Sequence, residues 1–211
     1  LDLENPFIKI ALDDRVLGVV NGYNRLFSYL YYFTLNKTMP VAEGTPPEQS
    51  QRWHRDPEDR RMTKIFIYLN DVDEGSGPFV YVRGSQYGGR LGHLFPQDPP
   101  RGCYPSAEEL EARVPLGEIM TCTGRAGTLV FADTAGLHKG GYATKNERIM
   151  FTAGYCSHAS AWPRRFRVPE NFHAHLTNMP LAPHAKFALN FKPHPIPFYF
   201  LRKIKRNLLV Y

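Results

Sequence analysis

The fold is decided by the stretch SQRWHRDPEDRRMTKIFIYLNDVDEGSGPFVYVRGSQ, residues 50–86. Its centre, 62–72, is a near-continuous apolar run, which is typical of a strand buried on both faces. The turn-rich segment 73–79 leads into a second, shorter strand that ends at Gly84. Two strands joined by a turn predict a β-rich domain.

The rest of the chain supports this prediction. Its 211 residues suit one domain over 1–211, and 17 Gly with 18 Pro fit short strands joined by turns better than a helix bundle. Further strands are expected at 27–36, 127–133 and 148–157, and we expect the strands at 27–36 and 62–72 to be central.

Two other regions flank these strands. The N-terminal segment has Asn5 and Pro6 as a cap and first-turn signal, so it predicts one or two short helices. Residues 86–124 form a long, lid-like insertion with one helix, because Ser106 and Glu109 make a capping box. The chain begins without Met, and we expect that part of the N-terminal helical region is missing.

His54 and Asp56 are separated by one residue just before the strand at 62–72. On an extended chain, residues i and i+2 point to the same face, so an imidazole and a carboxylate can reach one metal ion while Arg55 points away. The triplet alone is a weak signal, because a chain with 8 His often contains one by chance.

His138 follows the strand at 127–133 and its turn. Two histidines and one carboxylate from separate strands of a barrel make the facial triad of non-haem Fe(II) oxygenases. Such a triad leaves adjacent coordination positions open for a bidentate oxo-acid and for dioxygen. Arg148 begins the next strand, where its planar guanidinium suits a carboxylate.

These blocks, together with GTLVFADTAGLHKGG (127–141) and ERIMFTAGY (147–155), resemble the phytanoyl-CoA dioxygenase family of Fe(II)/2-oxoglutarate-dependent oxygenases. Residues 5–36 resemble the helix and strand before the metal motif in that family. The resemblance implies a mainly β fold, a double-stranded β-helix (jelly roll, cupin-like) with a few flanking helices. It makes His54, Asp56 and His138 the iron ligands, and Arg148 the partner of the distal carboxylate of 2-oxoglutarate.

The sequence departs from the family at two places. Gln86 stands where members commonly have His, and Gly140 where they often have Ser. Thr152, on the strand of Arg148, is a candidate to compensate for the lost hydroxyl. For the inner carboxylate of 2-oxoglutarate the family uses polar side chains of the preceding strand, here Thr34 and Asn36.

The expected function is hydroxylation of an unidentified small-molecule substrate, with Fe(II) as cofactor and with 2-oxoglutarate and O2 as co-substrates that become succinate and CO2. Two alternatives stay open. One is a non-catalytic jelly-roll binding module. The other is a cupin-like isomerase or hydrolase that uses another metal and has no need of Arg148.

The net charge of +6 lies in the C-terminal segment 171–211, which has six basic residues and no acidic residue. This segment is a candidate to contact an anionic surface or partner, but without a nucleic-acid-binding module we expect no nucleic acid. Three cysteines without C-x-x-C spacing, no apolar run of about 18 residues and no signal peptide predict a cytoplasmic protein without a transmembrane segment.

Overall fold

The computed structural model describes residues 1–97, 103–160 and 162–190. The chain divides into two compact units, Leu1–Phe33 with the chain from Gly154 onward, and Thr34–Ala153. The expected metal ligands and Arg148 all belong to the second unit. A single domain over 1–211 stays a prediction.

Short helices and strands alternate along the described residues. The helices are α1 (Pro6–Ala11), α2 (Asp14–Asn24), α3 (Ala107–Glu111), α4 (Phe172–His175) and α5 (Pro183–Leu189), with 3₁₀ turns η1 (Gln49–Gln51), η2 (Glu74–Ser76), η3 (Leu116–Glu118) and η4 (Leu176–Asn178). The strands are β1 (Tyr29–Thr38), β2 (Thr63–Tyr68), β3 (Phe79–Val82), β4 (Ile119–Cys122), β5 (Leu129–Ala132), β6 (His138–Lys139) and β7 (Arg148–Cys156). The prediction of a mainly β fold with a few helices is confirmed.

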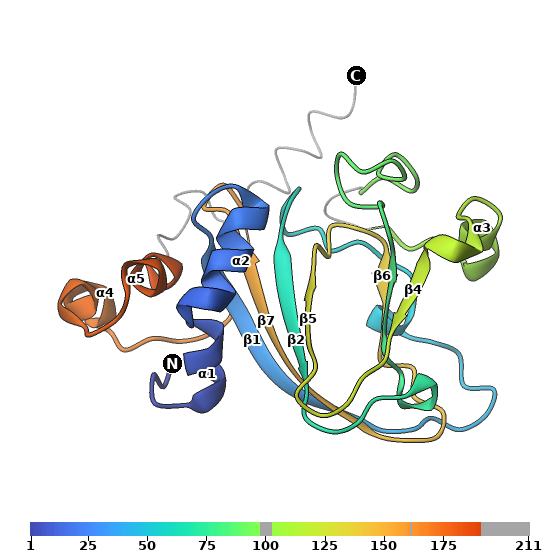
Figure 1. Ribbon diagram of the computed structural model, residues 1–211, viewed down its shortest axis with the longest axis horizontal. Helices are drawn as coiled ribbons and strands as arrows, with labels where there is room; N and C mark the ends of the chain where they lie inside the picture. The colour runs from blue at the N-terminus through green and yellow to red at the C-terminus, as the bar shows by residue number, and fades with distance from the viewer. Residues whose placement is uncertain (98–102, 161, 191–211) are drawn as a thin grey trace. The chain divides into compact units, whose positions relative to one another are not determined.

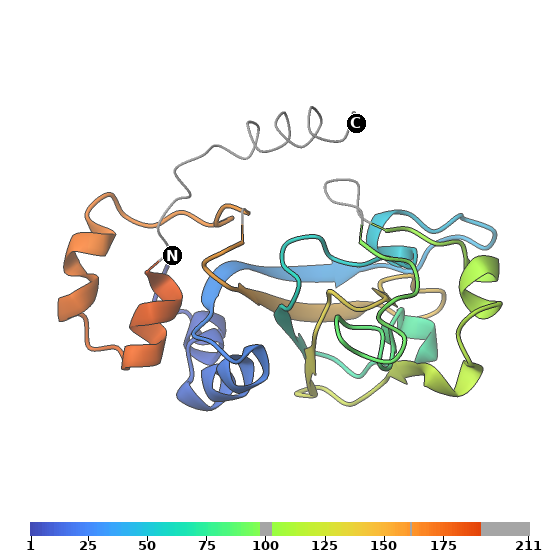
Figure 2. The same ribbon diagram turned by 90° about the horizontal axis from the view of Figure 1, so that it is seen from above.

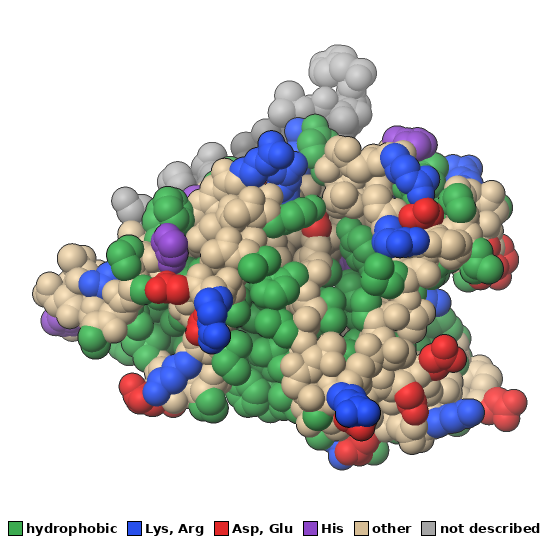
Figure 3. All heavy atoms as spheres, in the orientation of Figure 1, with side chains coloured by type: hydrophobic (Ala, Val, Ile, Leu, Met, Phe, Trp, Pro, Cys, Tyr) green, Lys and Arg blue, Asp and Glu red, His purple; other side chains and the backbone are tan. Residues whose placement is uncertain are grey.

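The strands form two sheets, with the orders β1-β7-β2-β5 and β4-β3-β6. Figure 1 shows β2 and β5 on one side of the second unit, facing β4 and β6 on the other. In Figure 2, the long strands β1 (blue) and β7 (orange) run side by side, as their order requires. The surface between the two sheets of the second unit is hollowed and lined largely by hydrophobic side chains (Figure 3).

Strand β2 forms as the apolar run predicts. All six of its residues are buried, and it pairs antiparallel with β5 in a register that sets Lys64 opposite Ala132 and Ile67 opposite Leu129. Because side chains alternate along a strand, Lys64, Phe66 and Tyr68 share one face. Phe66 and Tyr68 pack with Phe79 and Met150, so this face looks into the core between the sheets.

Strand β1 lies at the edge of its sheet, so the expectation that it is central was wrong. The aromatic residues that suggested a central strand are explained within the first unit, where Tyr29 and Tyr31 are buried and the Tyr31 carbonyl accepts a hydrogen bond from Arg165 N. Toward its other end β1 exposes Leu35, as an edge strand can.

The helix signals of the first unit are confirmed. The Asn5 side chain accepts a hydrogen bond from Phe7 N, with Pro6 in the first turn of α1, and Asp13 caps α2 in the same way. Among the helices of the described residues, none has the length and apolar character to cross a bilayer.

The predicted insertion, 86–124, contains α3, whose capping box between Ser106 and Glu109 is confirmed. A hydrophobic cluster that includes Trp53, Val82 and Leu137 attaches α3 to the sheet through Leu110. The last residues of this stretch form β4, which pairs antiparallel with β3. Residues 98–102 of the insertion and 191–211 of the basic C-terminal segment lie outside the described residues, so the surface role of that segment stays a prediction.

Candidate metal centre

His54 and His138 are brought together by the backbone. His54 N donates to the His138 carbonyl at 2.9 Å, and His138 N donates to the His54 carbonyl at 3.0 Å. His138 also pairs with Tyr81 of β3, so its position follows from the three-stranded sheet. Asp56 N donates to the Thr134 carbonyl at 2.9 Å, which keeps the chain extended through the H-x-D triplet.

Both imidazoles are held by the same kind of hydrogen bond. Nδ1 of His54 lies 2.8 Å from the Arg52 carbonyl, and Nδ1 of His138 lies 2.9 Å from the Gly136 carbonyl. A carbonyl only accepts, so each Nδ1 carries the proton and each Nε2 keeps its lone pair free. This is the tautomer that a metal-ligating histidine needs.

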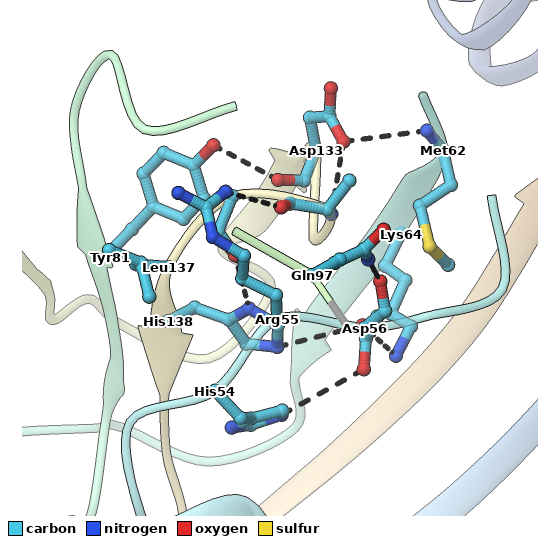
Figure 4. A network of polar contacts seen from close by, with 12 residues as sticks. His54, Arg55, Asp56, Met62, Lys64, Tyr81, Gln97, Asp133, Leu137 and His138 are labelled. Atoms are coloured by element: carbon cyan, nitrogen blue, oxygen red, sulfur yellow. Dashed lines mark hydrogen bonds and ion pairs between the residues drawn. The ribbon is translucent and has the colours of Figure 1, made fainter. Parts of the chain in front are cut away.

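Both Nε2 atoms point at Asp56 (Figure 4). His54 Nε2 lies 3.8 Å from Asp56 Oδ1, and His138 Nε2 lies 3.6 Å from Asp56 Oδ2. The three side chains are buried, and one ligand atom from each lies within 4.8 Å of the others. A metal ion with ligand bonds of about 2.1 Å needs ligand atoms roughly 3 to 3.5 Å apart, so small shifts of the side chains suffice.

The protonation states also suit a metal ion. Burial lowers the pKa of His54, and it lowers the pKa of His138 to about 3 despite the attraction of Asp56. Burial alone would raise the pKa of Asp56, but Lys64 and the two histidines outweigh it and lower that pKa below the usual range. At neutral pH the cluster therefore offers two neutral imidazoles and one carboxylate, which are the protonation states in which these groups bind metal ions.

Arg148 is buried at the start of β7. Its Nη1 donates to the Gly77 carbonyl at 2.5 Å, and its Nη2 lies 3.4 Å from Thr38 Oγ1. No carboxylate among the described residues pairs with it, and its Nε is buried without a hydrogen-bond partner. Buried polar groups normally have partners, so a buried guanidinium without a carboxylate partner is a candidate to bind an anionic ligand.

Two glycines lie beside this guanidinium. A Cβ atom at Gly140 would lie 3.5 Å from Arg148 Nη1, and one at Gly141, where φ is +92°, would lie 3.4 Å from Nη2. The residue at which the sequence departs from the family pattern, Gly140, therefore lies beside Arg148. Thr152, the candidate to replace the lost hydroxyl, is buried on the same face of β7 as Arg148.

Thr34 and Asn36 lie on the part of β1 that belongs to the second unit. The Thr34 hydroxyl donates to Asn36 Oδ1 at 3.1 Å, and the Asn36 side chain is exposed. This contact does not show that either residue binds a ligand. The roles of Thr34, Asn36 and Thr152 as contacts of 2-oxoglutarate stay predictions.

Sequence reasoning missed Lys64, whose ammonium lies 2.5 Å from Asp56 Oδ2. The available signal was a lysine on the Phe66 and Tyr68 face of an otherwise apolar strand. It also missed Thr38, two residues beyond Asn36 on β1. Arg55 was expected to point away from the cluster, and it does: its guanidinium donates to carbonyls on the other side of the chain.

The insertion reaches the metal cluster. The Tyr104 ring stacks on the His54 imidazole at a centroid distance of 5.9 Å and an angle of 15°, and the Arg52 guanidinium lies 5.6 Å from the centre of the Tyr104 ring. The Gln97 side chain donates to the Asp56 carbonyl (Figure 4). An exposed aromatic ring and an exposed arginine thus lie next to His54.

The comparisons with known structures establish the fold. EctD from S. alaskensis, solved with 2-oxoglutarate and 5-hydroxyectoine, matches with a TM-score of 0.55 and 19% identity over 92% of this chain and 63% of that chain. HygX from Streptomyces hygroscopicus, with nickel and 2-oxoglutarate bound, matches with a TM-score of 0.51 and 18% identity over 77% of this chain and 68% of that chain. The epimerase SnoN, in complex with Fe3+, alpha ketoglutarate and nogalamycin RO, matches with a TM-score of 0.51 and 18% identity over 77% of this chain and 64% of that chain.

These likenesses confirm the predicted double-stranded β-helix. The chain spans less than two thirds of the length of EctD and of SnoN. No curated protein matches the sequence. The model of the family described as Phytanoyl-CoA dioxygenase (PhyH) matches residues 9–150, which is most of the chain and includes the His-Asp-His cluster and Arg148. The chain therefore belongs to the phytanoyl-CoA dioxygenase family.

Proposed function

We propose that this protein is an Fe(II)- and 2-oxoglutarate-dependent dioxygenase that hydroxylates a small molecule. One observation carries the proposal. The buried cluster of His54, Asp56 and His138 belongs to the same compact unit as Arg148, a buried guanidinium with a vacant donor. A metal site alone fits many enzymes, whereas a metal site with a carboxylate-binding arginine fits a bidentate oxo-acid co-substrate.

His54, Asp56 and His138 would hold the iron, using two Nε2 atoms and a carboxylate oxygen. Bound Fe(II) would supply the activation of dioxygen, with electrons from 2-oxoglutarate. One oxygen atom of O2 enters a C–H bond of the substrate, and the other enters succinate as 2-oxoglutarate loses CO2. Backbone bonds hold the three ligands in place before the metal binds, because His54 and His138 bond to each other and Asp56 N donates to the Thr134 carbonyl.

Arg148 would bind the distal carboxylate of 2-oxoglutarate. Nη1 of the guanidinium donates to the Gly77 carbonyl and Nη2 lies near the Thr38 hydroxyl, whereas Nε has no partner. Phe79 contacts both His138 and Tyr68. The centroid of its ring lies 5.5 Å from that of His138, and the Phe79 backbone N donates a hydrogen bond to the Tyr68 hydroxyl. We propose Thr34, Asn36 and Thr152 as further contacts of 2-oxoglutarate.

The insertion would shape the substrate pocket, since Tyr104 and Gln97 already contact the H-x-D segment. A pocket beside a buried metal cluster suits a small-molecule substrate and excludes water from the reaction. EctD was solved with 2-oxoglutarate and a hydroxylated compound, which supports hydroxylation, whereas SnoN is an epimerase on a similar fold. We propose hydroxylation of a small molecule by a cytoplasmic enzyme.

The test is conversion of 2-oxoglutarate to succinate by the purified protein with Fe(II) and O2, in wild type and in the His138→Ala and Arg148→Ala variants. We expect succinate from wild type only. Turnover that needs a metal but not 2-oxoglutarate, and that survives Arg148→Ala, would contradict the proposal in favour of a cupin-like isomerase or hydrolase. With candidate substrates, gain of one oxygen atom marks hydroxylation, and unchanged mass marks epimerisation.

A further inference from the structure

Lys64 is a charged residue in the middle of a buried surface. Every residue of β2 is buried, and Lys64 itself is 9% exposed. Burying an ammonium costs free energy unless an anion compensates it. An aliphatic side chain would carry no such cost, so the lysine at this position indicates a polar role.

Asp56 is an anion that pairs with Lys64. The ammonium lies 2.5 Å from Asp56 Oδ2, and both side chains are 11% exposed (Figure 4). The pair joins a strand of the four-stranded sheet to the H-x-D segment that precedes it. Lys64 therefore contacts one of the three proposed iron ligands directly and lies on the side of the carboxylate away from His54.

The two oxygens of Asp56 have different surroundings. Oδ1 faces Nε2 of His54 at 3.8 Å, whereas Oδ2 lies between Nε2 of His138 at 3.6 Å and the Lys64 ammonium. The last torsion of an aspartate has a broad, two-fold profile, so a carboxylate without a partner can rotate. A fixed cation on Oδ2 removes that freedom.

We propose that Lys64 is a positioning residue for the metal centre. By holding Oδ2, it keeps the Asp56 carboxylate turned toward His54 and His138 before the metal binds, and it opposes the use of both oxygens as ligands. This inference rests on the proposed function, because it assumes that the cluster binds a metal ion. Residues that contact and orient a ligating side chain typically contribute about 10- to 100-fold in metal affinity.

A purely electrostatic role predicts the opposite effect. A cation beside the cluster repels a divalent ion, so removing its charge would tighten metal binding if orientation were unimportant. Lys64→Met removes both the donor and the charge at similar length, whereas Lys64→Gln removes the charge but keeps an N–H donor for Oδ2. The two variants therefore separate orientation from charge.

The experiment measures binding of Co(II), a visible spectroscopic probe, to the metal-free wild type and to Lys64→Met, Lys64→Gln, His138→Ala and Lys9→Met. The Lys9→Met variant is the matched control, because Lys9 also pairs with a carboxylate, Glu4, at 2.7 Å, but on the surface of the other unit. The dissociation constant and the visible spectrum at saturating Co(II) are recorded, with circular dichroism to verify folding.

We expect Lys64→Met to raise the dissociation constant about 10- to 100-fold and to change the Co(II) spectrum, with a smaller loss in Lys64→Gln and none in Lys9→Met. Unchanged or tighter Co(II) binding by folded Lys64→Met would overturn the inference, as would equal losses of Co(II) affinity in Lys64→Met and Lys64→Gln. A variant with lower thermal stability but wild-type affinity and spectrum would show a structural role instead.

If Lys64→Met does not fold, Lys64→Gln alone decides. A loss of Co(II) affinity in Lys64→Gln as large as that in His138→Ala would overturn the inference, and a smaller loss with a changed spectrum supports it. Wild type that binds no Co(II) or Fe(II) would contradict the proposed function itself.

Discussion

His54 and His138 exchange both of their backbone hydrogen bonds, and their ring centroids lie 4.1 Å apart. Two residues that exchange both bonds form a hydrogen-bonded antiparallel pair, so their side chains leave the backbone on the same face. Each Nδ1 then bonds to a carbonyl two residues earlier in its own segment. The two imidazoles are thus placed by the polypeptide and do not depend on an ion to bring them together.

The turn before His138 has no room for a side chain at Gly136. A Cβ atom there would lie 2.1 Å from the Tyr81 hydroxyl and 2.9 Å from Ser85 Oγ, and the Gly136 carbonyl is the partner of His138 Nδ1. Gly136→Ala should therefore tilt His138 and weaken metal binding about tenfold, as measured by titration with Co(II). Gly117→Ala, whose Cβ would meet no atom within 4 Å, is the control. Equal affinities of the two variants would contradict this role of the turn.

Arg55 ties the insertion to the H-x-D segment. Its guanidinium donates to the carbonyls of Ser85 at 2.5 Å, Ala135 at 2.7 Å, Leu94 at 2.7 Å and Phe95 at 2.8 Å. Arg55→Met would leave these carbonyls without their donor, so the free energy of unfolding should fall by about 3 kcal/mol or more. Urea denaturation measures the loss.

The exposed Arg60 provides the comparison for Arg55. Its guanidinium lies 5.5 Å from the centre of the Tyr87 ring, a surface contact. Arg60→Met should change the free energy of unfolding by less than about 1 kcal/mol. A loss of similar size in both variants would mean that the buried hydrogen bonds of Arg55 do not stabilise the fold.

The metal-free protein should lose stability as the pH falls below about 6.5. Burial lowers the pKa of His54 and lowers that of His138 to about 3, so the folded protein keeps both neutral. The unfolded chain binds protons on these residues near pH 6.5, and stability falls where the unfolded state binds more protons. The decline should extend from about pH 6.5 toward pH 3. Thermal unfolding midpoints at a series of pH values measure it, and a decline equally steep in His138→Asn would refute its assignment to His138.

Arg148→Lys keeps the charge but loses the planar fork. Because a point charge cannot bind a carboxylate through two parallel donors, affinity for 2-oxoglutarate should fall about tenfold or more, with a smaller effect on metal affinity. Arg125→Lys, at an exposed position of the same unit, should leave both affinities unchanged. Equilibrium titration of the metal-loaded proteins with 2-oxoglutarate tests this. Wild-type affinity in Arg148→Lys would remove Arg148 from the co-substrate site.

Much of the fold was predictable because its signals are local. The apolar run of β2, the capping box of Ser106 and Glu109, and the caps at Asn5 and Pro6 each depend on neighbouring residues, and each is confirmed. The position of β1 was not predictable, because an aromatic strand looks the same whether its neighbours are two strands or one strand and a loop. The edge is set by pairing between distant segments.

The metal cluster was predictable in part. The spacing of His54 and Asp56 and the later His138 indicated a triad, and the structure brings all three together. Lys64 was not recognised, because an isolated lysine in an apolar run gives no sign of which carboxylate it meets. The contact of Tyr104 with His54 depends on how the insertion folds back, which no short motif encodes.

The most direct measurement is an anaerobic titration of the metal-free protein with Fe(II) and 2-oxoglutarate, recorded in the visible range. We predict a metal-to-ligand charge-transfer band that needs both components in wild type, that is absent from His138→Ala, and that needs much more 2-oxoglutarate in Arg148→Ala. A folded protein that gives no band at saturating Fe(II) and 2-oxoglutarate would contradict the assignment of His54, Asp56, His138 and Arg148 to an iron and 2-oxoglutarate site.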